Sequence, residues 1–188
     1  MQKNLLLSVV AGIVLFVWGF ISWAVLPWHN MVANKFTNEA AVAQALKENS
    51  PQQGIYYLPF SEKDHGPNQV GAFANVHPQG TEMNMGKQMA IALVTQIIGA
   101  FLVLMLLRQT GGLTYWGKVG FVALVGLIIG FVSHVPYWNW FGFPAPYVLV
   151  TILDTAVGWT LAGLAVAKFA SGRRKALKSE QKGQRRRR

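Results

Sequence analysis

The feature that most constrains this chain is a set of four long apolar segments, because about 20 apolar residues in a row span a bilayer core as a helix. The segments cover residues 5–26, 89–107, 119–135 and 147–167. The first contains no charged residue and is about 33 Å long as a helix. The sequence therefore predicts an all-α integral membrane protein, with four transmembrane helices in a membrane domain of residues 1–170.

The first segment also has a rival interpretation as a cleaved signal peptide, since Lys3 precedes the apolar run. Its apolar run is longer than the roughly 7–15 residues of a signal-peptide core. The stretch 24–28 also offers no pair of small residues for cleavage. We therefore expect a retained membrane anchor.

The basic residues predict the orientation, because cytoplasmic loops carry the excess of Lys and Arg. With both termini inside, 13 of the 17 basic residues fall on the cytoplasmic side. Residues 27–87 then lie outside, with four lysines against five acidic residues. The pattern predicts a multi-pass protein of the bacterial cytoplasmic (inner) membrane, with the loop 27–87 periplasmic or extracellular.

The outer segment 27–87, about 60 residues long, is too long for a structureless connection and is expected to form a cap on the helix ends. Within it, Thr37 is the expected N-cap of a short helix over 38–48. Residues 54–60 are expected to be extended, and residues 61–80, rich in Gly, Pro, Asn and Asp, to form a loop. On the inner side, the short link 109–116 predicts that the second and third spans are neighbours.

An internal repeat is a further hypothesis. Residues 19–23 followed by 27–30 resemble residues 130–134 followed by 136–139, and both stretches end outward-going helices. This pattern is consistent with a duplicated two-helix hairpin of the kind found in some transporters. Chance similarity between apolar segments is the alternative.

Asp154 is the only acidic residue in the four segments. A carboxylate in hydrocarbon costs a few kcal/mol, so it must face protein or water. His134, Gln96 and Ser133 fall in the same half of the bilayer, and we expect them to form an intramembrane polar cluster with Asp154. Such a cluster could relay a proton or cation, or it could simply fix the packing of the helices.

Ring residues gather where the spans reach the outer interface, as is typical of membrane proteins. The expected outer aromatic patch consists of Trp23, Trp28, Tyr137, Trp138, Trp140, Phe141 and Phe143. Small residues allow close helix contact. The expected packing positions are Gly126, Gly130 and Gly163.

Several kinds of chemistry are disfavoured by the sequence. The chain has no cysteine, which excludes disulfides and thiolate metal sites. His77, Met83 and Met85 are the nearest approach to a metal-binding pattern, but they are too sparse to predict a site. No phosphate-binding loop, dinucleotide fingerprint or catalytic motif is present. We expect neither an enzyme nor a cofactor, apart from bound lipid.

The C-terminal residues 171–188 are strongly basic and have almost no apolar content, so a disordered cytoplasmic tail is expected. A basic stretch next to a membrane attracts anionic lipid. The expected contacts are Arg173, Arg174, Lys175 and Lys178. Nucleic-acid binding is disfavoured because the basic residues are not interleaved with aromatic ones.

Three functions fit these features. The first is a non-enzymatic accessory or scaffold subunit that docks a protein partner, or further copies of itself, through its aromatic outer surface and small-residue helix faces. The second is a small oligomeric transporter or channel-like protein that uses the polar cluster. The third is an outer-face module that binds lipid or metal.

Overall fold

The computed structural model describes residues 2–64 and 66–170, which are mostly helical. Four helical stretches are long and apolar enough to cross a membrane, at Lys3–Val25, Met85–Gln109, Tyr115–Phe141 and Ala145–Val166. The prediction of a multi-pass protein with four such helices is confirmed. The predicted basic tail and its four lipid-contact residues lie outside the described residues.

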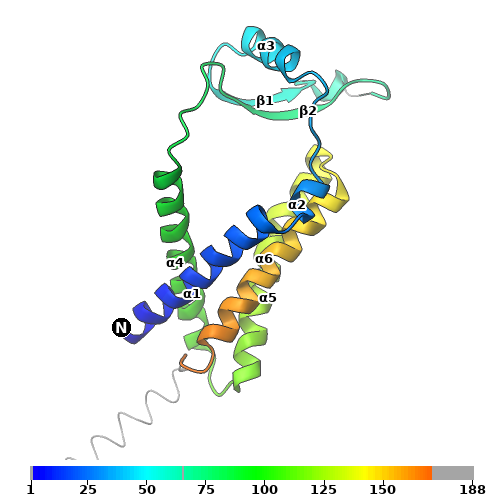
Figure 1. Cartoon of the computed structure of the whole chain (residues 1–188). Helices are drawn as coiled ribbons and strands as arrows, with labels where there is room; N and C mark the ends of the chain where they lie inside the picture. The colour runs from blue at the N-terminus through cyan, green and yellow to red at the C-terminus, as the bar shows by residue number, and fades with distance from the viewer. Residues whose placement is uncertain (1, 65, 171–188) are drawn as a thin grey trace, which may run out of the picture. The chain divides into compact units, whose positions relative to one another are not determined.

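The chain divides into two compact units (Figure 1). Of the described residues, 2–33 and 85–170 belong to the membrane unit, whereas the second unit is formed within 34–84.

In the membrane unit, α1 (Gln2–Phe20) packs against both α4 (Met85–Gln109) and α6 (Ala145–Val166), and α5 (Tyr115–Phe141) packs along α6 (Figure 1). α4 and α5, which the short link joins, are in contact but pack much less extensively than α1 with α4 or α5 with α6. The reason is that α1 occupies the packing face of α4. A β-carbon on Gly12 of α1 would lie 2.5 Å from Ile97 Cγ1 of α4, which shows how closely the two backbones approach.

Glycines bring α5 and α6 into similarly close contact. A β-carbon on Gly126 would collide with the side chain of Trp159, and one on Gly130 would lie 3.1 Å from Ile152 Cα. Gly163 faces Val122 in the same way. The structure thus places all three expected packing glycines between α5 and α6. The core of the unit is apolar and includes Leu7, Ala11, Leu15, Ala100, Val103, Leu104, Leu107, Val122, Trp159, Ala162 and Val166.

The second unit combines α3 (Glu39–Asn49), the strands β1 (Gly54–Leu58) and β2 (Ala72–Val76), and a 3-10 turn at Glu62–Asp64. The N-cap of α3 is Asn38, whose side chain accepts a hydrogen bond from the Ala41 amide at 3.0 Å. The expected cap at Thr37 is therefore one residue too early.

The expected loop at 61–80 contains a strand. β2 pairs with β1 in an antiparallel ladder, with Gly54 opposite Val76 and Leu58 opposite Ala72. Phe73 lies opposite Tyr57, and their rings meet edge to face with centroids 5.2 Å apart. The loop prediction is wrong here because pairing with β1 gives Ala72–Val76 a regular structure despite the turn-forming residues around it.

Candidate functional site: a buried polar cluster

The site begins where α1 changes its pitch. Residues Ile21–Val25 form a π-helix, in which the Leu26 amide donates to the Ile21 carbonyl at 2.9 Å. Leu26 is extended, as is usual for a residue before proline, and the short helix α2 (Trp28–Met31) follows. Such wide turns often occur at functional sites. Here the turn lies between Trp18 and His29, both of which interact with α6.

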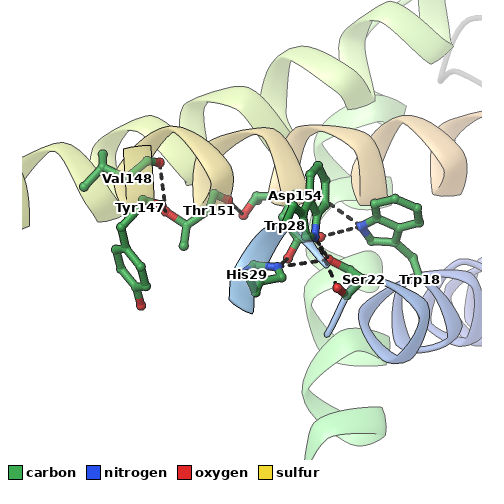
Figure 2. A network of polar contacts seen from close by, with 9 residues as sticks. Trp18, Ser22, Trp28, His29, Tyr147, Val148, Thr151 and Asp154 are labelled. Carbon is green, nitrogen blue, oxygen red and sulfur yellow. Dashed lines mark hydrogen bonds and ion pairs between the residues drawn. The ribbon is translucent and has the colours of Figure 1, made fainter. Parts of the chain in front are cut away.

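Asp154 of α6 receives these side chains (Figure 2). The indole N–H of Trp18 donates to Asp154 Oδ1 at 2.7 Å, and it also lies 3.0 Å from the Asp154 backbone oxygen. His29 Nε2 lies 3.4 Å from the other carboxylate oxygen, Oδ2. Both oxygens of this carboxylate therefore face nitrogen atoms from the N-terminal part of the chain.

Ser22 connects the remaining members. Its hydroxyl oxygen accepts a hydrogen bond from the indole N–H of Trp28 at 3.0 Å and lies 3.0 Å from His29 Nε2. Ser22 is fully buried, and the His29 side chain is only 4 % exposed. We call these residues the Asp154 cluster: Trp18, Ser22, Trp28, His29 and Asp154.

Aromatic rings enclose the cluster. Trp23 stacks on the His29 imidazole with ring centroids 3.8 Å apart and planes at 10°, while Trp28 meets the same imidazole edge-on. On α6, Gly158 lies one turn after Asp154, and a β-carbon there would come within 2.7 Å of Trp18 Cδ1. Glycine at this position lets the Trp18 indole lie against α6, beside the carboxylate that it contacts.

The contacts of His29 suit the tautomer with its hydrogen on Nε2. This nitrogen faces a carboxylate oxygen, which accepts hydrogen bonds but does not donate them when ionised, and it also faces the Ser22 hydroxyl oxygen, which can accept. The second ring nitrogen, Nδ1, is buried and has no hydrogen-bond partner among the described residues. Unpaired buried polar atoms of this kind are uncommon in folded proteins.

The structure gives Asp154 different partners from the expected ones. His134 Nδ1 lies 2.8 Å from the Gly130 carbonyl of its own helix, Ser133 is exposed, and Gln96 is half-buried on α4. In the described chain, no hydrogen bond or ion pair joins any of these three to Asp154.

The sequence analysis did not identify Trp18, Ser22 or His29 as partners of Asp154. A usable signal was nevertheless present. Trp18 and Ser22 are four residues apart, and so are Asp154 and Gly158, so each pair lies on one helix face. His29 reaches Asp154 only because of the π-turn, and the pattern of apolar residues does not predict that turn.

The expected outer aromatic patch is divided in the structure. Tyr137 contacts Phe141 and Phe143, with ring centroids 5.8 Å and 5.2 Å apart. Trp138 and Trp140 of the same helix are exposed. The ring contacts of Trp23 and Trp28, by contrast, belong to the Asp154 cluster.

The weak metal candidates gain no further ligands. Met83 and Met85 are exposed, and His77 follows β2. Within 2–64 and 66–170, no group of three or more His, Cys, Asp or Glu side chains could hold a metal ion.

Comparison with known proteins found no matching family model, curated protein or solved structure.

Proposed function

We propose that this protein is a non-enzymatic accessory or scaffold subunit of a membrane assembly. The observation that supports this most directly is that the carboxylate of Asp154 is already occupied by contacts within the chain. Trp18 approaches one of its oxygens at 2.7 Å and His29 the other at 3.4 Å. A charge in a transmembrane helix is expensive, and here it joins three helical elements, α1, α2 and α6.

The surface proposed for docking is the end of α5. Trp140 is 77 % exposed and Trp138 is 52 % exposed, and both lie beside the ring cluster of Tyr137 and Phe141. Exposed tryptophans are frequent anchors of protein interfaces. The packing glycines Gly126, Gly130 and Gly163 are engaged between α5 and α6, so we assign the docking to the aromatic residues instead.

A pair of variants tests this proposal. Trp116 is 71 % exposed at the opposite end of α5 and is therefore a matched control for Trp140. We expect a partner to co-purify in fixed stoichiometry with the wild-type chain when it is isolated gently from native membranes. Trp140→Ala should lose that partner and Trp116→Ala should retain it. A chain that migrates alone in native gels and native mass spectra would contradict the scaffold role.

A small oligomeric transporter is the second candidate, and the observation that favours it is the proximity of an intramembrane carboxylate to an imidazole. In reconstituted vesicles, proton or cation flux that is abolished by Asp154→Asn would support transport over scaffolding. An outer-face module binding lipid or metal through residues 27–87 is a third proposal, for which elemental and lipid analysis of the purified chain is the test.

We further propose that the chain lies in a bacterial inner membrane with both termini inside and with anionic lipid at its basic tail. The distribution of Lys and Arg supports this orientation. A duplicated hairpin is also proposed, supported by the extensive pairing of α1 with α4 and of α5 with α6. The two halves differ at their outer ends, where α1 passes into a π-turn but α5 continues as one helix through Pro136.

A further inference from the structure

We propose that the His29–Asp154 pair is a proton-binding site, in which His29 Nδ1 takes up a proton and forms an imidazolium paired with the Asp154 carboxylate. This site is independent of the scaffold role and goes beyond it. The proton comes from the aqueous phase and bonds to the Nδ1 lone pair, so that no other bond is broken.

The first argument is the asymmetry between the two ring nitrogens. Nε2 faces Ser22 Oγ at 3.0 Å and Asp154 Oδ2 at 3.4 Å, whereas Nδ1 has no partner. Its lone pair is the free basic position of the ring. Protonation there breaks no hydrogen bond that the structure contains.

The second argument concerns size. Nδ1 has less than 1 Å² of accessible surface. Trp23 also covers one face of the imidazole at a centroid distance of 3.8 Å. A ligand larger than a proton therefore cannot reach this atom without displacing the groups that bury it.

The third argument is charge. With His29 neutral and Asp154 ionised the pair carries one negative charge, and with His29 protonated it is neutral. A pair with no net charge is less costly within a membrane than a carboxylate that has no opposite charge beside it. Protonation also makes the contact between Nε2–H and Oδ2 a charge-assisted one.

Among the described residues, His29 is the basic side chain that pairs with Asp154. From α1, the π-turn and α2, the cluster receives only Trp18, Ser22, Trp28 and His29, and of these His29 is the one whose side chain can carry a positive charge. On α5, the His134 ring faces its own Gly130 carbonyl. The basic residues of α1, α4 and α5 are Lys3, Lys87, Arg108 and Lys118. They lie near helix ends, and no described ion pair joins them to Asp154.

Proton binding should strengthen the attachment of α2 to α6. When His29 is paired with Asp154, the protein binds one proton more than when His29 has moved away. The His29–Asp154 contact is therefore favoured at low pH and weakens as the pH rises. Trp18 would still hold α1 to the carboxylate after His29 is released. Loss of the proton would therefore loosen α2 and the π-turn from α6, while α1 stays attached.

Nitrogen NMR of the full chain in lipid nanodiscs, with ¹⁵N-labelled histidine, tests the proposal, because imidazolium and neutral imidazole nitrogens have distinct shifts. The His29 signals are assigned by their loss in His29→Gln. We expect His29 to be doubly protonated at mildly acidic pH and to lose one proton on alkalinisation. In Asp154→Asn, which preserves the shape of the side chain, His29 should remain neutral under the same mildly acidic conditions.

His134 provides the matched control within the same sample. Its environment does not include Asp154, so its signals should be the same in the wild type and in Asp154→Asn. A His29 ring that stays singly protonated in the wild type at mildly acidic pH would overturn the proposal and indicate a purely structural imidazole. A doubly protonated ring that is unchanged by Asp154→Asn would overturn the pairing with the carboxylate.

Discussion

Ser22 is the smallest side chain of the Asp154 cluster, yet it interacts with two of its rings. Its hydroxyl oxygen accepts from Trp28 at 3.0 Å and lies 3.0 Å from His29 Nε2. It is fully buried. A single hydroxyl group therefore helps to position both Trp28 and the imidazole of His29.

We predict that Ser22→Ala destabilises the protein by about 0.5–1.5 kcal/mol, the usual net contribution of a hydrogen bond, because the Trp28 indole N–H keeps the Ser22 backbone oxygen at 3.2 Å and His29 Nε2 keeps Asp154. The measurement is the apparent melting temperature in detergent, followed by tryptophan fluorescence. Ser133→Ala is the matched control, because Ser133 occupies the corresponding position of the sequence repeat but is exposed. Equal losses in the two variants would show that the Ser22 hydroxyl is not a structural contact.

At the level of single residues, the sequence identified the unusual group but not its partners. Asp154 stands out because it is the only acidic residue in the apolar segments. Its partners were expected on neighbouring spans at similar depth, at His134 and Gln96. Trp18 and His29 reach it instead. The four-residue spacing of Trp18 and Ser22 places both on one helix face but does not say which helix that face meets, and the turn before α2 has no local sequence signal.

Among the elements, the α5–α6 pair depends on close contact at glycine. We predict that Gly126→Ala lowers stability by about 1–3 kcal/mol, because the added methyl group collides with Trp159 and the helices must move apart. Thermal unfolding in detergent measures this loss. Gly120→Ala on the same helix has open space around it and should be neutral or slightly stabilising, since alanine favours helix. If the melting temperature is unchanged in Gly126→Ala, α5 and α6 can move apart without losing stability, and the prediction is wrong.

The long helices could be predicted at this scale because about 20 apolar residues permit few other structures. Their ends could not be placed as well. α5 extends from Tyr115 to Phe141, beyond the apolar core of 119–135, because polar and aromatic residues at the interfaces continue the helix. β2 was missed for a different reason, since five residues of weak strand preference become a strand only by pairing with β1.

For the molecule as a whole, the proposed orientation can be tested directly by cysteine labelling. The chain has no cysteine of its own, so an introduced cysteine is the only thiol that can react. In sealed right-side-out membranes, a membrane-impermeant maleimide should label Ser61→Cys in the outer segment. It should label Gly111→Cys, in the link between α4 and α5, only after the membrane is opened. Labelling in the reverse order would contradict the assignment of both termini to the inside.

The π-turn at Ile21–Val25 has a consequence for how this part of the chain tolerates insertions and deletions. A π-turn contains one residue more than an α-turn, so the residues before and after it are out of helical phase by about 100°. Deleting one residue there would restore a regular helix while rotating Trp18 relative to His29, so the two could no longer meet the same carboxylate. The separation of 11 positions from Trp18 to His29 should therefore be the same in every variant of this protein that keeps its function.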